Sequence, residues 1–155
     1  MEAPPPGART TTVPLVLVVP AAIPAKSVKE LIALATSRAG GLSYASSGEG
    51  SISHLAGELF KSATGVAMVH VPYKGGGPAL VDTMAGHVPI YFSSIPTSLP
   101  HIRSGRLRAL AVTGAARSKH LPNMPTVDEA AGTRGYMTEV MYGVLAPAEI
   151  GRAHV

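Results

Sequence analysis

Apolar runs of strand length alternate with segments of helical periodicity from Leu15 onward, and this alternation restricts the fold more than any other feature. Parallel strands are buried on both faces, so they are near-continuously apolar, and each needs a crossover helix to reach the next. The predicted strands are Leu15–Val19, Leu42–Ser46, Val66–Val71, Val88–Ser93, Leu107–Thr113 and Glu139–Ala146. The sequence therefore predicts an α/β fold with a mostly parallel sheet and crossover helices on both faces.

Capping residues and apolar spacing place helices between these strands. Ser27 with Glu30 and Thr126 with Glu129 fit the capping box, in which a hydroxyl and an acid three residues later satisfy the first N–H groups of a helix. Glycine ends each apolar stripe, as is typical of helix C-termini. The predicted helices, each with the glycine that stops it, are Ser27 to Gly40, Ile52 to Gly65, Pro78 to Gly86, Ser98 to Gly105 and Thr126 to Gly132.

The composition argues against several classes of function. Charged residues make up 14% of the chain and aromatic residues 5%, with a net charge of +4, which is too little for a surface that reads nucleic acid through basic stripes and stacked rings. No cysteine is present, so no disulfide or thiolate site is expected. The apolar run after Leu15 is bounded by Pro14 and Pro20 and is shorter than the roughly 20 residues of a membrane span.

Four loops of small residues follow successive predicted strands: SSGEGSIS, PYKGGGPA, SSIPTS and TGAARS. If all strands run the same way, these loops meet at the carboxyl edge of the sheet. Helix-start N–H groups and short hydroxyls there suit a small ligand that bears carboxylates. Glycine and serine are also ordinary residues of tight turns and N-caps, so one loop alone leaves both interpretations open.

Catalytic patterns are weak in this sequence. The serine-rich segment lacks the GxSxG elbow, and KGGGPA is no P-loop because Lys74 precedes the glycines. The six histidines show no HxxxH spacing, so neither a metal site nor a cofactor is expected. A small α/β enzyme, a hydrolase or transferase that uses the serine/glycine-rich loop, remains the alternative to a binding protein.

Several long segments occur in a fixed order between Leu15 and Ala148: IPAKSVKELIALA, LSYASSGEGSISHLAGELFKSATG, VHVPYKGGGPALVDTMAGHV, LPHIRSGRLRALAVTGAARS, LPNMPTVDEA and YGVLAPA. Together they resemble the Bug-type receptors, the extracytoplasmic solute-binding proteins of tripartite tricarboxylate transporters. The resemblance implies a lobe of the periplasmic binding protein type II kind, a small carboxylate solute, a membrane permease as partner, a monomer, periplasmic localisation and no catalysis.

In receptors of this kind, loops of two lobes hold the ligand carboxylates with backbone amides, hydroxyls and ordered waters. Transferred to this chain, the ligand-binding residues would be Ser46, Ser47, Gly48, Gly50, Ser51, Ser53, Tyr73, Lys74, Gly75, Gly76, Gly77, Ser93 and Ser94. Two positions depart from the family pattern. Glu49 stands where an asparagine or a small residue is usual, and an acid or amide is common near Ser93, so the class of solute stays open.

The resemblance also divides the chain. Residues 1–12 are expected to be a disordered proline-rich lead, residues 13–118 the second, ligand-binding lobe, and residues 119–148 a crossover segment that returns toward the first lobe. Residues 149–155, EIGRAHV, are interpreted as a non-native tail, and the natural chain is expected to continue past Ala148. A single lobe supplies half the contacts, so weak or no affinity is expected, and a nonfunctional gene fragment is a third interpretation.

Overall fold

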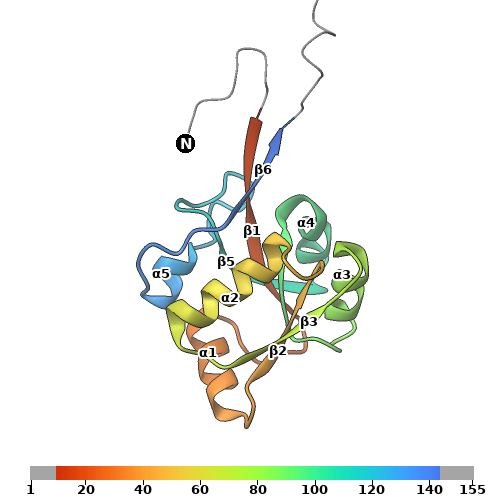
Figure 1. Ribbon diagram of the computed structural model, residues 1–155, viewed down its shortest axis with the longest axis vertical. Helices are drawn as coiled ribbons and strands as arrows, with labels where there is room; N and C mark the ends of the chain where they lie inside the picture. Colours follow the sequence, from red (N-terminus) through yellow and green to blue (C-terminus); the bar gives the residue numbers. More distant parts are fainter. Residues whose placement is uncertain (1–9, 144–155) are drawn as a thin grey trace, which may run out of the picture.

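The computed structural model describes residues 10–143. Figure 1 shows a twisted sheet with helices packed on it and two strands, β1 and β6, that run side by side beyond the body of the lobe. The elements in chain order are β1 (Thr10–Pro20), α1 (Val28–Ser37), β2 (Leu42–Ser46), α2 (Ile52–Thr64), β3 (Met68–Pro72), α3 (Gly76–Met84), β4 (Ile90–Ser94), α4 (Ile95–Arg103), β5 (Leu107–Val112), α5 (Val127–Ala131) and β6 (Glu139–Gly143).

The element order agrees with the predicted alternation, and the differences lie at the ends of elements. β1 begins at Thr10, so the last residues of the predicted lead are strand. α3 begins at Gly76 before Pro78, and α4 begins at Ile95 rather than Ser98. The end of the last predicted strand, the rest of the lead and the predicted tail lie outside the described residues.

The sheet is mixed, with the strand order β3-β2-β4-β1-β5 and with β6 paired to β1. β2 runs parallel to β3 and β4, whereas β1 runs antiparallel to β4, β5 and β6. The prediction of an α/β fold is confirmed, but the sheet is mixed instead of mostly parallel in its pairings, and the expectation that all strands run the same way is wrong for β1. A strand buried on both faces is apolar in either direction, so the hydrophobic pattern of β1 carries no information about its direction.

Both faces of the central strand β1 are buried under helices. Leu15, Leu17 and Val19 contribute to the core beneath α1, α2 and α5. Val16 and Val18 point the other way, into the core beneath α3 and α4. All five side chains are at most 2% exposed, which confirms the prediction of helices on both faces and explains why this run contains no polar residue.

The capping boxes form only in part. The Ser27 hydroxyl accepts a hydrogen bond from the Glu30 N–H at 3.2 Å, but the Glu30 carboxylate accepts from the Lys26 N–H, one residue before the cap. Thr126 likewise accepts from the Glu129 N–H at 3.2 Å. The Glu129 carboxylate pairs instead with Arg117 of the loop after β5, at 2.8 Å. The hydroxyl half of each predicted box is therefore present, and the acid bonds elsewhere.

Gly57 is the point of closest packing between α2 and the sheet. A Cβ atom at this position would lie 2.1 Å from the ring of Tyr44, a β2 side chain that is fully buried. Any side chain here must displace that ring, which also packs edge-on against Phe92. The absence of a side chain at Gly57 therefore sets how near α2 approaches the sheet.

We predict that Gly57→Ala destabilises the lobe although alanine favours helix. Overpacking costs about 1–3 kcal/mol or more and exceeds the gain of about 1 kcal/mol in helix propensity. Gly77→Ala is the matched control, because a Cβ there meets no atom within 4 Å. Urea unfolding of both variants measures the difference. Equal stability of the two variants would contradict this packing.

Candidate functional site

Three strands that share a direction, β2, β3 and β4, end at one edge of the sheet, and each leads into a helix that starts there (Figure 1). A pocket of about 260 Å³ opens at this edge. We call it the edge pocket. Its lining residues are Leu15, Ser47, Ile52, Ser53, Gly76, Gly77, Tyr91, Phe92, Ser93, Ser94, Thr97, Val140 and Tyr142.

The first turns of α2, α3 and α4 all contribute to the edge pocket. Ser51 caps α2 by accepting a hydrogen bond from the His54 N–H at 3.3 Å. The N-cap residues of α3 and α4, Gly75 and Ser94, make no side-chain cap bond among the described residues. The first N–H groups of a helix carry partial positive charge, so Gly76 and Gly77 of α3 and Ile95 and Thr97 of α4 can offer donors to an anion, whereas Pro78 and Pro96 have no N–H.

No charged residue is among those that line the pocket. An anion bound here would therefore meet N–H groups and hydroxyls instead of a lysine or arginine. Such donors are fixed by the backbone and favour a carboxylate by directed hydrogen bonds. The apolar part of the wall, formed by Leu15, Phe92 and Val140 among others, suits the carbon skeleton of a small organic acid.

A hydroxyl cluster forms the side of the pocket next to α2. The Ser53 Oγ atom accepts a hydrogen bond from the Ser47 N–H at 2.9 Å and lies 3.1 Å from the Ser47 Oγ atom. It also lies 3.0 Å from the Ser51 Oγ atom. Across the pocket the Ser94 and Thr97 hydroxyls are 2.6 Å apart. These pairs hold the hydroxyls in place before any ligand binds, which lowers the entropic cost of binding.

Of the ligand-binding residues predicted from the sequence, the structure brings Ser47, Ser53, Gly76, Gly77, Ser93 and Ser94 together in the edge pocket. The others are not among its lining residues: Ser46, Gly48, Gly50, Ser51, Tyr73, Lys74 and Gly75. The loop after β5, which was expected at the same edge, contributes no lining residue. Its first residue, Thr113, hydrogen-bonds to the backbone of Leu15 and Thr138 instead.

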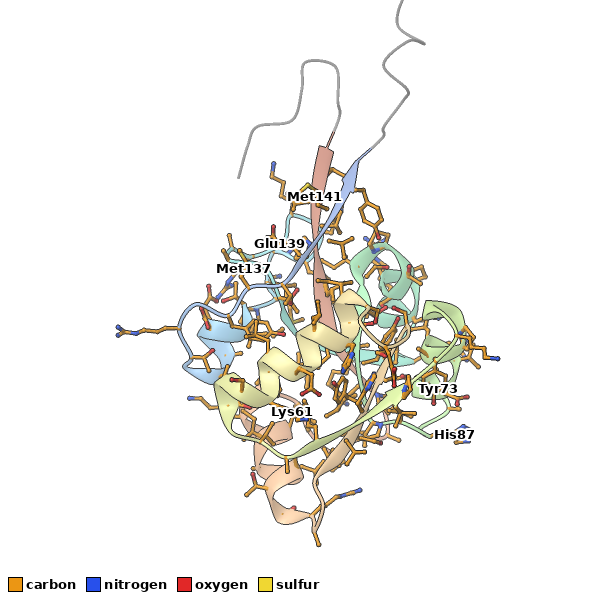
Figure 2. All side chains as sticks on the ribbon, in the orientation of Figure 1. Lys61, Tyr73, His87, Met137, Glu139 and Met141 are labelled. Carbon is orange, nitrogen blue, oxygen red and sulfur yellow. The ribbon has the colours of Figure 1, made fainter. Side chains whose placement is uncertain are left out.

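The residues outside the pocket wall have other contacts. The Tyr73 hydroxyl donates to the Asp82 carboxylate at 2.8 Å, so this side chain lies against α3 (Figure 2). The Gly75 N–H donates to the Ser47 carbonyl at 3.1 Å and ties the loop after β3 to the loop after β2. Gly75 has a φ of 109°, which side chains rarely adopt. Lys74 is exposed.

Seven residues of the pocket wall are not in the set predicted from the sequence: Leu15, Ile52, Tyr91, Phe92, Thr97, Val140 and Tyr142. Tyr91 carries one signal, because it lies two residues before Ser93 and so shares a face of β4 with it. Its hydroxyl lies close to Gly76, where a Cβ would be 3.1 Å away. Burial raises the pKa of Tyr91, so the hydroxyl stays protonated and can donate. The β6 residues Val140 and Tyr142 could not be predicted as pocket residues from the sequence, because only the fold places β6 beside β1.

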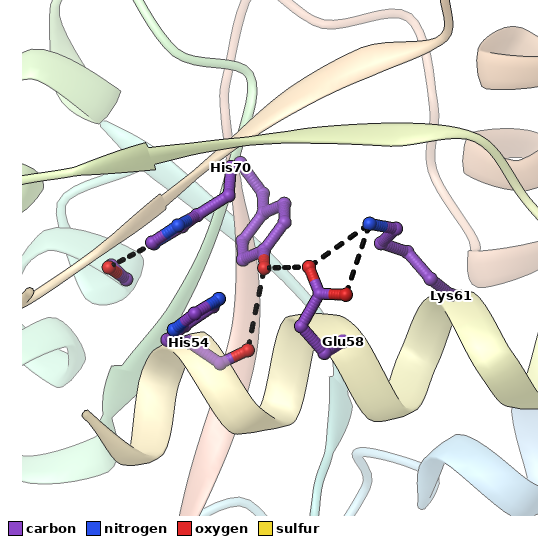
Figure 3. A network of polar contacts seen from close by, with 6 residues as sticks. His54, Glu58, Lys61 and His70 are labelled. Atoms are coloured by element: carbon purple, nitrogen blue, oxygen red, sulfur yellow. Dashed lines mark hydrogen bonds and ion pairs between the residues drawn. The ribbon is translucent and has the colours of Figure 1, made fainter. Parts of the chain in front are cut away.

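Two histidines lie stacked behind the loop that joins β2 to α2 (Figure 3). The rings of His54 on α2 and His70 on β3 are parallel within 3° and their centroids are 3.8 Å apart. The sequence placed them on separate elements and gave no sign of this contact. No group of three or more metal-binding side chains occurs among residues 10–143, and parallel rings do not converge on one ion.

The histidine pair adjoins a second polar network on α2 (Figure 3). The Tyr44 hydroxyl donates to the Glu58 carboxylate at 2.6 Å, and Lys61 donates to the same group at 3.0 Å. The bond from Tyr44 and then that from Lys61 lower the pKa of Glu58. Burial lowers the pKa of His70, and the neighbouring His54 lowers it further, against the opposing effect of Glu49 and Glu58.

We predict that the lobe loses stability as the pH is lowered below about 6.5, the ordinary pKa of histidine. Because the folded-state pKa of His70 is lowered, the unfolded chain binds the proton more tightly, and stability is lost as the pH falls through this range. Urea unfolding at pH 7.5 and 5.5 measures the loss, in a range where carboxylates with ordinary or lowered pKa values hardly titrate. The variant His70→Phe keeps a stacking ring and should lose less. An identical loss in both proteins would contradict the role of His70.

Loops of small residues at the carboxyl edge of an α/β sheet are typical of ligand-binding folds. The family model described as "Tripartite tricarboxylate transporter family receptor" matches residues 7–153. The chain belongs to this family, as the sequence resemblance predicted. The family is one of transporter-linked receptors, not of enzymes.

Known relatives give the same assignment. Protein BugT of Bordetella pertussis is 42% identical over 135 residues, which cover 87% of this chain and 41% of BugT. Among solved structures, R. palustris Rpa4515 with adipate is 41% identical with a TM-score of 0.81, covering 90% of this chain and 48% of that one. The periplasmic binding protein BugD is 33% identical with a TM-score of 0.81, covering 89% of this chain and 46% of that one.

A further similar structure is MatC (Rpa3494) from Rhodopseudomonas palustris with bound malate. It is 29% identical to this chain with a TM-score of 0.80, and the match covers 88% of this chain and 46% of that one. The chain therefore spans less than half the length of each of these four relatives. No helix among residues 10–143 is long and apolar enough to cross a membrane.

Proposed function

We propose that this chain supplies one lobe of a periplasmic solute receptor and binds a small dicarboxylate in the edge pocket. The observation that carries the proposal is the meeting of three helix starts and their hydroxyls at a pocket without charged lining residues. Two structural relatives were solved with adipate and malate, which are both small dicarboxylates. The ligand-binding residues are those of the predicted set that line the pocket, with Thr97 and Tyr91 in addition.

The exposure of β6 and the segment before it supports a second lobe in the working receptor. Met137, Met141 and Tyr142 are between 54% and 57% exposed, and Tyr142 also lines the pocket (Figure 2 labels the two methionines). Large exposed apolar side chains gathered on one segment are typical of surfaces that another part covers. A second lobe would close over the pocket, and a membrane permease would receive the solute. The lobe alone is then expected to bind with a Kd of about 1 mM or weaker.

We predict that a negative charge at Thr97 weakens solute binding at least tenfold without destabilising the lobe. Thr97 is exposed in the first turn of α4, where an aspartate stabilises the helix dipole but repels a carboxylate in the pocket. Thr97→Asn is the matched control, because asparagine has the same shape as aspartate but carries no charge. NMR titration with adipate should show at least a tenfold weaker Kd for Thr97→Asp, about 1.4 kcal/mol.

The same titration with 1,6-hexanediol tests the need for carboxylates, because this molecule has the chain length of adipate and no charge. Wild-type protein should respond to adipate and not to the diol. Equal affinity of the Thr97→Asp and Thr97→Asn variants for adipate, or equal responses to the two compounds, would contradict carboxylate binding at this edge. Unfolding temperatures of the two variants check that the substitution leaves the lobe folded.

A further inference from the structure

The segment Ser46–Ser53, which runs from the last residue of β2 to the first turn of α2, carries hydroxyls of the edge pocket, yet its own turn is exposed. Glu49 and Gly50 are solvent-exposed, and Gly50 has a φ of 73°. Small residues with left-handed backbone are free to move unless other groups hold them. The groups that hold this turn decide how well the Ser47 and Ser53 hydroxyls are preorganised.

Two of those groups are the stacked histidines. The Gly50 N–H donates to the Nδ1 atom of His54 at 3.0 Å. The Nε2 atom of His70 lies 2.6 Å from the hydroxyl of Ser46, which is fully buried. That hydroxyl accepts from the Gly48 N–H at 3.2 Å. The pair therefore holds the turn at both ends, through Ser46 at the strand side and through Gly50 at the helix side.

The stack is what fixes the direction of these bonds. His54 comes from the first turn of α2 and His70 from β3, so each ring limits the rotation of the other. Neither histidine is a lining residue of the edge pocket. The polar and charged groups around the pair are Glu49 on the turn, Tyr44 on β2 and Glu58 with Lys61 on α2.

We propose that His54 and His70 are positioning residues for the binding site. They hold the Ser46–Ser53 turn in the shape that directs the Ser47 and Ser53 hydroxyls into the edge pocket, and they touch no solute. This inference rests on the proposed function for its effect on binding, whereas the ordering of the turn can be measured without any solute.

The test compares His54→Phe with His54→Asn. Phenylalanine keeps a ring that stacks on His70 but has no acceptor for the Gly50 N–H, whereas the asparagine oxygen can occupy the position of Nδ1. Amide exchange followed by NMR in the solute-free chain should be at least about fivefold faster at Gly50 in His54→Phe than in wild type. It should be near the wild-type rate in His54→Asn. Adipate affinity should fall in the first variant and recover in the second.

A second variant tests the role of His70 independently of His54. His70→Phe removes the partner of Ser46 and should accelerate exchange at Gly48, with the fold checked by thermal unfolding. Unchanged exchange at both glycines in the two phenylalanine variants would overturn the inference, whatever adipate does. An absence of any adipate response in the wild-type chain would count against the proposed function alone, because exchange at Gly48 and Gly50 is measured separately.

Discussion

The shared direction of β2, β3 and β4 is the constraint on which the site depends. Because these strands are parallel, each ends at the same edge and each is followed there by the start of a helix. The first turns of α2, α3 and α4 then contribute to one small pocket, and the two that lack a side-chain cap can attract an anion without an ionised side chain. Reversing any one of these strands would move one helix start to the opposite edge.

β1 makes this arrangement possible although it runs the other way. It lies between β4 and β5 and buries side chains of both faces, so the two cores of the lobe meet on one strand. Its pairing with β6 brings Val140 and Tyr142 to the pocket from a distant part of the chain. The antiparallel strand thus supplies the apolar side of a pocket whose polar side comes from the parallel strands.

Much of this could be predicted from local pattern, and the rest depended on tertiary contacts. The alternation of apolar runs predicted the order of strands and helices, because burial on both faces is visible in composition. The small-residue loops predicted Ser47, Gly76 and Ser93 as pocket residues, since parallel strands bring such loops together. The direction of β1 and the stack of His54 on His70 could not be predicted, because neither changes the periodicity of its own segment.

A crystal structure of the chain with adipate tests the central claim most directly. The account predicts one carboxylate within hydrogen-bond distance, about 3 Å, of the first N–H groups of α3 and α4, with the Ser94 or Thr97 hydroxyl as a further donor. A carboxylate paired instead with Lys26 in the groove along α1, or with Lys74 outside the pocket, would contradict it.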